Sequence, residues 1–147
     1  MIQPKSEARL HYYNELEVGQ TFEREYAVTR QVYEDFLKLF GDASPLHVDA
    51  DYARACDFPD VLMHGAILNG FISNFVGMHF PGGRGMELSV DIRFLKPVWV
   101  EDVIRIEGKL AQKLDSHQVV VLHMSFTNKQ TGEAVASAKV QLKMMPV

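Results

Sequence analysis

Residues 65–80 read GAILNGFISNFVGMHF, a run without aspartate, glutamate, lysine or arginine. Nearly all of its side chains are apolar or small, so a helix over Gly65–Phe80 is apolar on most of its faces. Such a helix must be buried, and its sixteen residues are too few to span a bilayer comfortably. We therefore expect this helix at the centre of the fold, with a sheet wrapped around it.

The chain that follows this helix is predicted to be β structure. Alternating apolar and polar side chains predict strands over residues 86–95, 103–114 and 117–128, and a last strand follows over residues 133–145. The KQTG sequence at residues 129–132 is typical of a hairpin turn. On the first of these strands, the apolar residues that share one face are Leu88, Val90, Ile92 and Phe94.

The part of the chain before the central helix is predicted to contain one strand and two shorter helices. β-Branched and aromatic residues predict a strand over residues 21–28, and Thr29 can cap a helix over residues 30–40 that Gly41 ends. A short second helix is expected over residues 50–56. The face of the 30–40 helix that we expect to be buried consists of Val32, Phe36, Leu39 and Phe40. This order of elements predicts an α+β fold with its helices grouped on one side.

Length and composition favour one ordinary globular domain. The chain has 147 residues, of which 47% are apolar and 23% charged, and its net charge of −4 does not favour a general nucleic-acid binder. No apolar run is long enough for a transmembrane helix. We expect residues 1–13 to be an N-terminal arm, which lacks the apolar stretch of a signal peptide, and residues 14–147 to be the domain. The single cysteine, Cys56, excludes an intrachain disulfide and favours a cytoplasmic location.

The segment of residues 40–49, FGDASPLHVD, carries the clearest candidate chemistry. Asp42 and His47 lie five residues apart on either side of Pro45, and we expect a loop that brings both side chains to one point. Such a pair can hold a water molecule and transfer protons near neutral pH. The alternative is that Asp42 only caps a turn and that His47 is a surface or packing residue.

Gly65 is the second candidate, because it is expected to open the central helix. Backbone N–H groups at a helix N-terminus lack partners inside the helix and carry the positive end of its dipole, so they can polarise a carbonyl oxygen. A glycine there lets a substrate approach the backbone closely. The alternative, that Gly65 only permits tight packing of the helix on the sheet, is equally open.

These motifs resemble those of a known enzyme family. The pattern Gly-Asp-x-Ser-Pro-Leu-His-x-Asp at residues 41–49, followed by His-Gly at residues 64–65, is similar to the hydratase motif of the MaoC-like dehydratases, the (R)-specific enoyl-CoA hydratases. The resemblance extends over about residues 16–145 and includes PGGRG at residues 81–85. It implies a single hot-dog fold, in which an antiparallel sheet wraps a long central helix. It also implies a homodimer or higher homo-oligomer with sites at the subunit interface.

The resemblance implies roles for individual residues. Asp42 and His47 would hold one water, add its hydroxyl to C3 of a trans-2-enoyl thioester and deliver the proton to C2. The reverse reaction would dehydrate an (R)-3-hydroxyacyl thioester. The Gly65 amide would be the oxyanion hole for the thioester carbonyl. The expected substrate-binding residues are Ser44, which orders the loop, His64, which supports Gly65, Ser73, which lines the site, and Arg84, which can meet the phosphates of coenzyme A.

The predicted function is thus a hydro-lyase that acts on acyl thioesters. Its substrate is carried by coenzyme A or an acyl carrier protein, so coenzyme A is part of the substrate and no separate cofactor is expected. No metal is expected, because His47-x-Asp49 with the distant His64 is a weak signature and Asp49 is predicted to cap a helix. Two alternatives stay open: a hot-dog acyl-CoA thioesterase, which would release a free thiol, and a non-catalytic module that binds acyl-CoA.

Overall fold

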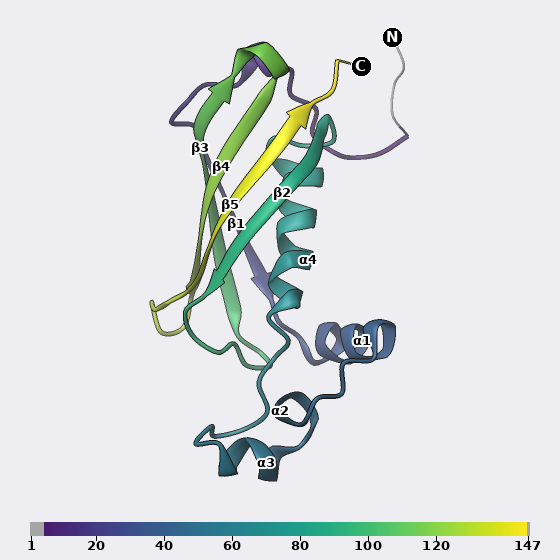
Figure 1. The fold of residues 1–147 in the computed structure, drawn as a ribbon, viewed down its shortest axis with the longest axis vertical. Coiled ribbons are helices and arrows are strands. Elements are labelled where there is room, and N and C mark those ends of the chain that lie inside the picture. Colours follow the sequence, from purple (N-terminus) through teal and green to yellow (C-terminus); the bar gives the residue numbers. More distant parts are fainter. Residues whose placement is uncertain (1–4, 147) are drawn as a thin grey trace.

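A five-stranded antiparallel sheet packed against one long helix forms the body of the protein (Figure 1). Residues 5–146 are described in the computed structural model. The strands are β1 (Thr21–Ala27), β2 (Gly85–Phe94), β3 (Val103–Leu114), β4 (Val119–Asn128) and β5 (Ala134–Met144), and their order in the sheet is β1-β3-β4-β5-β2. This arrangement confirms the predicted α+β hot-dog fold.

The helices divide between the body and a lobe beyond the end of the sheet. The helix against the sheet is α4 (Ala66–Asn74), which continues into η2 (Phe75–His79). The lobe consists of α1 (Arg30–Phe40), α2 (Pro45–Val48) and α3 (Ala50–Ala55), and it lies next to the N-terminal end of α4 (Figure 1). The remaining short turns are η1 (Tyr13–Glu15) and η3 (Asp115–His117). No helix among residues 5–146 is both long and apolar enough to cross a membrane.

The core lies between the sheet and the central helix. Alternation along β3 points Ile104, Ile106 and Leu110 inward, where they are fully buried, while the charged residues between them face solvent. The side chains that α4 and η2 bury against the sheet recur at helical spacing: Ile67, Leu68, Ile72, Phe75 and Val76. Burial of this apolar surface is the main favourable term in folding, so the helix and the sheet stabilise each other.

Only one face of the central helix is buried, contrary to the expectation for residues 65–80. The exposed residues on the opposite face of α4 are Ala66, Asn69, Gly70, Ser73 and Asn74. The lack of charged residues in this run suggests burial on all sides, but small side chains and amides carry no charge and are still stable in contact with solvent. The helix also changes its hydrogen bonding, since the Phe80 N–H donates to the Phe75 carbonyl at 2.9 Å in a π-type turn.

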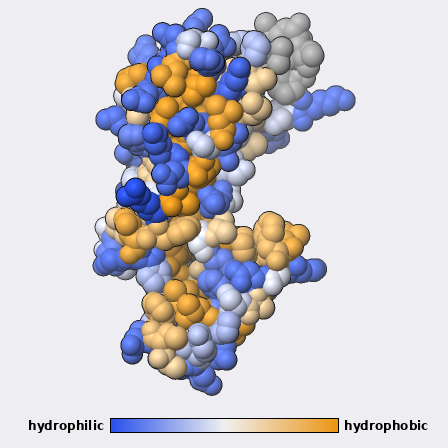
Figure 2. All heavy atoms as spheres, viewed as in Figure 1, coloured by the Kyte–Doolittle hydropathy of each residue, from blue (hydrophilic) through white to orange (hydrophobic). Residues whose placement is uncertain are grey.

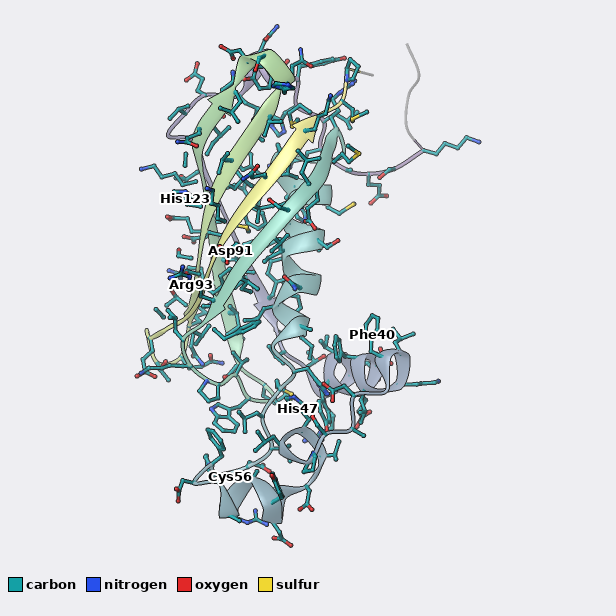
Figure 3. All side chains as sticks on the ribbon, in the orientation of Figure 1. Phe40, His47, Cys56, Asp91, Arg93 and His123 are labelled. Carbon is teal, nitrogen blue, oxygen red and sulfur yellow. The ribbon has the colours of Figure 1, made fainter. Side chains whose placement is uncertain are left out.

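Two predictions in the lobe also need correction. The expected loop at residues 42–47 is partly helical, because Pro45 occupies the first turn of α2, where its missing N–H costs nothing. On α1, Leu39 and Phe40 are 76% and 70% exposed, although we expected them on the buried face. The apolar residues of α1 span more of its circumference than the rest of the lobe covers. Apolar atoms therefore gather on the lobe surface (Figure 2), and Phe40 projects from α1 (Figure 3).

Strand β2 carries an irregularity that the alternation pattern hides. Its register with β5 shifts at Leu88, which is half exposed, and such a bulge re-aims the side chains around it. Val90 and Ile92 pack against the core, whereas Phe94 at the end of the strand is 55% exposed. The four apolar residues expected on one face are therefore not equally buried.

The described part of the N-terminal arm packs against the body. The Arg9 N–H donates to a carbonyl of η2 at 3.0 Å, and the Gly83 N–H donates to the Arg9 carbonyl at 2.9 Å. Tyr13 is buried, and its hydroxyl donates to Asp115 at 2.7 Å, which anchors the end of the arm. The predicted arm also includes residues 1–4, which lie outside the described residues.

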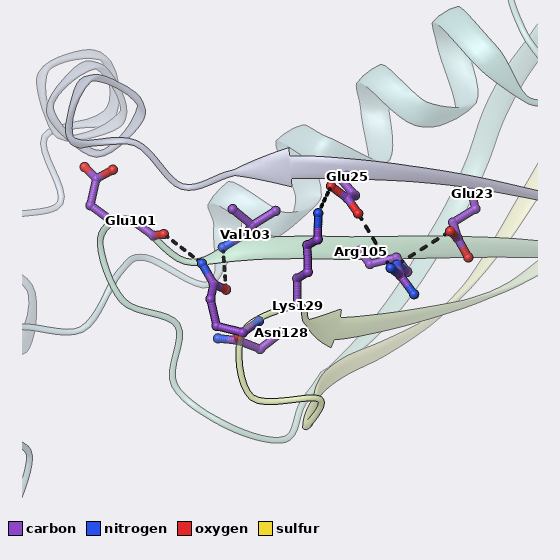
Figure 4. Close-up of polar contacts among 8 residues, drawn as sticks. Glu23, Glu25, Glu101, Val103, Arg105, Asn128 and Lys129 are labelled. Atoms are coloured by element: carbon purple, nitrogen blue, oxygen red, sulfur yellow. Dashed lines mark hydrogen bonds and ion pairs between the residues drawn. The ribbon is translucent and has the colours of Figure 1, made fainter.

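Charged side chains occupy the solvent face of β1 and β3 (Figure 4). Arg105 lies 3.5 Å from Glu23 and 3.6 Å from Glu25, and Lys129 donates to Glu25 at 2.9 Å. The hydrogen bond from Lys129, with the charges of Lys129 and Arg105, lowers the pKa of Glu25. Exposed pairs of this kind add little stability, but charges on the edge strand β1 protect it from pairing with another chain.

Gly108 on β3 provides a test of the core packing. A Cβ at this position would lie 2.8 Å from Cε1 of Phe75, whose ring is fully buried. Because the ring has no free space to move into, we expect Gly108→Ala to lower the free energy of unfolding by about 1–3 kcal/mol. The Phe75→Leu substitution replaces the ring that a Cβ at position 108 would meet with a smaller side chain. Gly108→Ala is therefore expected to lower the free energy of unfolding by less in the Phe75→Leu background than in the wild type.

Urea unfolding of the wild type, both single variants and the double variant measures these costs. The control is Lys109→Ala, an exposed site on the same strand, which is expected to stay within about 0.5 kcal/mol of the wild type. An equal cost of Gly108→Ala in both backgrounds would show that Phe75 does not limit this position.

Candidate active site

Three segments meet where the lobe joins the body: the turn after α1, helix α2 and the stretch that leads into α4. Asp42 lies on the first, His47 on the second, and His64 with Gly65 on the third. Figure 3 shows His47 at this junction. One ring nitrogen of each histidine and one carboxylate oxygen of Asp42 lie within 4.8 Å of one another. The fold thus brings the carboxylate and both imidazoles to one place.

The turn after α1 positions the Asp42 carboxylate. Helix α1 ends at Gly41, whose φ of 69° is a conformation that residues with a side chain rarely adopt. Asp42 then accepts a hydrogen bond from the Ser44 N–H at 3.2 Å. Hydrogen bonding from the Ser44 side chain, followed by that from the Ser44 N–H, lowers the pKa of Asp42. The carboxylate is therefore ionised at neutral pH and acts as a hydrogen-bond acceptor.

A main-chain carbonyl fixes the orientation of His47. Its Nδ1 lies 2.7 Å from the Leu62 carbonyl oxygen, and since a carbonyl only accepts, Nδ1 carries a proton, which leaves the lone pair of the neutral ring on Nε2. Nε2 lies 3.9 Å from Oδ2 of Asp42. The Tyr33 hydroxyl donates to the His47 carbonyl at 2.6 Å, and burial raises the pKa of Tyr33, so this donor stays protonated. Helix α2 is thereby tied to α1.

His64 forms the inner wall of the site. It is 3% exposed, and its ring centroid lies 4.0 Å from that of His47 and 4.7 Å from that of Phe36. Its Nε2 lies 2.7 Å from the Asp42 carbonyl oxygen, so in the neutral ring Nε2 carries the proton and Nδ1 the lone pair. The buried Nδ1 has no hydrogen-bond partner within residues 5–146. An unpaired buried acceptor of this kind costs free energy unless another group binds it.

Gly65 stands at the N-terminal end of α4. The first hydrogen bonds there are donated by the N–H groups of Ile67 and Leu68, and no residue in the described range accepts from the Gly65 N–H. A Cβ at Gly65 would lie 3.0 Å from the half-exposed Phe94 ring, which rests against the glycine. The structure supports both interpretations of Gly65. The missing side chain leaves room for the Phe94 ring, as the packing role requires, and the N–H has no partner, as the oxyanion role requires.

A cavity of about 430 Å³ opens beside these groups, within the usual range for small-molecule sites. His47, His64 and Gly65 line it. The apolar side chains that complete the lining include Val28, Leu62, Ile67, Leu68, Phe94 and Val98. The cavity thus combines an apolar wall, which suits a hydrocarbon chain, with two imidazoles and an unpaired backbone N–H.

Two residues predicted to bind substrate lie elsewhere in the protomer. Ser73 is exposed about 12 Å along the helix from Gly65 and lines a different hollow beside the N-terminal arm. Arg84 lies before β2, at the opposite end of the helix from Asp42 and His47, and is 5% exposed. Its guanidinium carbon lies 4.1 Å from the centre of the Tyr12 ring. In the described part of the chain, neither side chain meets the Asp42 carboxylate or the His47 ring.

Sequence reasoning missed three groups that shape the site: the Tyr33 hydroxyl, the Phe94 ring and the Leu62 carbonyl. Tyr33 shows only as an aromatic residue on α1, and Phe94 only as the end of an alternating strand. Their contacts with His47 and Gly65 arise from tertiary packing. The Leu62 carbonyl leaves no sequence signal at all, because every residue has a carbonyl group.

Known proteins with similar sequences and structures support one family. A 3-hydroxybutyryl-CoA dehydratase of Methylorubrum extorquens is 27% identical over 106 residues, which cover 72% of this chain and 68% of that protein. An (R)-specific enoyl-CoA hydratase of Rhodospirillum rubrum is 30% identical over 95 residues, which cover 65% of this chain and 66% of that protein. An unliganded R-hydratase structure from Pseudomonas aeruginosa has a TM-score of 0.82 at 28% identity and covers 91% of this chain and 85% of that chain. The aligned regions span about two thirds of both curated relatives.

The family described as MaoC like domain matches residues 13–133, which is most of the chain. The matched region contains the Asp42 turn, both histidines of the site and Gly65. The named relatives above are a hydratase and a dehydratase of coenzyme A thioesters. The chain therefore belongs to the MaoC-like family.

Proposed function

We propose that this protein is a hydro-lyase that interconverts trans-2-enoyl thioesters and (R)-3-hydroxyacyl thioesters. The observation that carries the proposal is the approach of the Asp42 carboxylate to Nε2 of His47, 3.9 Å apart, beside the unpaired amide of Gly65. Membership of the MaoC-like family and the names of the relatives support the same reaction class. The acyl group is carried by coenzyme A or an acyl carrier protein, and the reaction needs no further cofactor.

One water molecule satisfies both members of the catalytic pair. The carboxylate of Asp42 and Nε2 of His47 are both acceptors, so neither donates to the other, and 3.9 Å is too long for a direct hydrogen bond. A water between them donates one hydrogen to each. Its oxygen then keeps lone pairs for attack on the substrate.

Hydration proceeds by addition across the double bond. The water oxygen bonds to C3 while one of its protons passes to Nε2 of His47, and the electron pair of the double bond shifts toward the thioester carbonyl. The Gly65 N–H stabilises the charge that develops on the carbonyl oxygen. A proton then returns to C2, and the reverse sequence dehydrates the (R)-3-hydroxyacyl thioester.

The apolar cavity is the proposed site of the acyl chain. Its wall of Val28, Ile67 and Leu68 offers no charge to an alkyl group. The Phe94 ring rests on Gly65 and is half exposed, so rotation of this side chain gives the thioester carbonyl access to the amide. The reacting carbons then lie next to the bound water.

The direct test is the loss of enoyl-thioester absorbance with crotonyl-CoA and a longer trans-2-enoyl-CoA, followed by chiral analysis of the product. Formation of the (R)-3-hydroxyacyl thioester from either substrate is the expected result. Release of free coenzyme A thiol would instead favour a thioesterase. Tight binding of the enoyl thioester without turnover would favour a non-catalytic binding module.

Replacement of either catalytic side chain is expected to abolish most of the activity. Asp42→Asn removes the negative charge that orients the water and His47→Gln removes the base that takes its proton, and we expect each to lower kcat at least about 100-fold. The matched controls are Asp49→Asn, which keeps a capping group on α3, and His123→Gln, which lies exposed on β4. Both controls are expected to keep kcat within a few-fold of the wild type. Wild-type rates in Asp42→Asn or His47→Gln, measured with crotonyl-CoA, would contradict the mechanism.

The oxyanion role of Gly65 is tested by a pair of variants. Gly65 has a φ of −57°, which proline can adopt, so Gly65→Pro removes the N–H without changing this angle, whereas Gly65→Ala keeps it. Both add a Cβ that displaces the exposed Phe94 ring. We expect kcat of Gly65→Pro to be at least about 100-fold below that of Gly65→Ala. Equal values of kcat, with thermal denaturation showing both proteins folded, would assign Gly65 to packing alone.

We further propose that the working unit is a homodimer that uses the open edge of β2. This edge strand exposes the apolar side chains Met86, Leu88 and Phe94 among its charged residues. An open edge with exposed apolar side chains can pair with another chain. Sedimentation equilibrium is expected to give the mass of a dimer for the wild type and a smaller mean mass for Leu88→Lys. A monomeric wild type would contradict the proposal.

A further inference from the structure

Asp42, His47 and His64 come together at one place, and each imidazole is held by a main-chain carbonyl through one of its ring nitrogens. The Leu62 carbonyl binds Nδ1 of His47 and leaves Nε2 with a lone pair, and the Asp42 carbonyl binds Nε2 of His64 and leaves Nδ1 with a lone pair. The Asp42 carboxylate adds a negative charge. In the neutral rings the second nitrogen of each histidine is an acceptor, and one ring nitrogen of each histidine lies within 4.8 Å of an Asp42 carboxylate oxygen.

A water molecule satisfies only two of these acceptors, because it has two hydrogens. The Nδ1 atom of His64 is buried and has no partner within residues 5–146, so it is the acceptor left over when a water bridges Asp42 and His47. A divalent cation, in contrast, accepts electron pairs from all three groups at once. Although the sequence predicts no metal, we propose that these three residues form a binding site for a divalent transition-metal ion, Zn²⁺ above all, and that the ion inhibits the enzyme.

The surroundings of both histidines are those of metal-binding imidazoles. A histidine that binds a metal through one nitrogen usually donates the other N–H to a carbonyl or carboxylate, which fixes the ring. Both rings already make this bond, at 2.7 Å, before any ion is bound. The chain therefore needs no change of tautomer at either histidine to receive a metal.

The spacing of the three groups suits an ion after a small movement. Zinc binds imidazole nitrogen and carboxylate oxygen at about 2.0–2.2 Å, so two ligands of a tetrahedral site lie about 3.4 Å apart. One ring nitrogen of each histidine and one Asp42 carboxylate oxygen lie within 4.8 Å of one another, and Nε2 of His47 lies 3.9 Å from Oδ2 of Asp42. The Asp42 side chain is 51% exposed and is free to rotate inward, whereas the buried His64 stays in place.

The donor set selects the class of ion. Two imidazoles and one carboxylate suit Zn²⁺ and Co²⁺, whereas Mg²⁺ and Ca²⁺ prefer sites made of oxygen ligands. Asp49, the other carboxylate of the motif, is not available because it accepts hydrogen bonds from the first residues of α3. Three protein ligands leave the fourth position of the ion open toward the cavity.

The proposed inhibition rests on the proposed function, because the ion takes the place of the reactive water. A metal bound to Nε2 of His47 removes the base, and the metal also removes the Asp42 carboxylate from the water. Zn²⁺ is therefore expected to lower kcat with crotonyl-CoA, and addition of a chelator is expected to restore it. Metal binding itself does not depend on the reaction and is tested separately.

The test is isothermal titration calorimetry of the full chain, free of any affinity tag and of substrate, with ZnSO₄ alone. We expect one Zn²⁺ per chain in the wild type and no comparable binding of Mg²⁺. His64→Gln keeps an amide that can donate to the Asp42 carbonyl but removes the Nδ1 lone pair, and we expect it to weaken Zn²⁺ binding at least about tenfold. Asp42→Asn is expected to weaken it as well.

The controls Asp49→Asn and His123→Gln keep the three proposed ligands and are expected to bind Zn²⁺ as the wild type does. Absence of Zn²⁺ binding to the folded wild type would overturn the proposal, and so would equal affinities of His64→Gln, Asp42→Asn and the wild type. Since calorimetry needs no turnover, an inactive enzyme that binds Zn²⁺ would contradict the proposed function and leave the metal site standing.

Discussion

Two main-chain carbonyl groups, those of Leu62 and Asp42, decide the chemistry of the site. Each accepts a hydrogen bond from one imidazole at 2.7 Å and thereby fixes which ring nitrogen carries the proton. With the opposite tautomer, His47 would present an N–H toward the Asp42 carboxylate and could not serve as the proposed base. Asp42 contacts both histidines, because its main-chain carbonyl accepts a hydrogen bond from His64 while its side-chain carboxylate faces His47.

The fold keeps both carbonyls in place by tying the lobe to the body. The Leu62 N–H donates to the Leu46 carbonyl of α2, and the Met63 N–H donates to the Val98 carbonyl beyond β2, both at 2.9 Å. The chain then enters α4, whose apolar face is buried against the sheet. The helix that fills the core therefore also positions Gly65, so the stability of the core and the geometry of the site depend on the same packing.

The sequence predicts these parts to different degrees. The central helix and the strands follow from charge-free and alternating patterns, and the motif around Asp42 and His47 is compact enough to identify a site. Exposure is harder to predict, because Ser73 and Leu39 carry no signal of how much of their helices the neighbouring elements cover. The tautomer of each histidine is beyond sequence analysis, since the Leu62 carbonyl that fixes it for His47 belongs to the backbone.

The most direct test of this account is a measurement of the two histidine tautomers by ¹⁵N NMR, with His47→Gln and His64→Gln used to assign the signals. At a pH where both rings are neutral, we expect His47 to carry its proton on Nδ1 and His64 to carry its proton on Nε2. This result would place a lone pair on Nε2 of His47, which faces the Asp42 carboxylate, and another on the buried Nδ1 of His64. A proton on Nε2 of His47, or on Nδ1 of His64, would contradict the account.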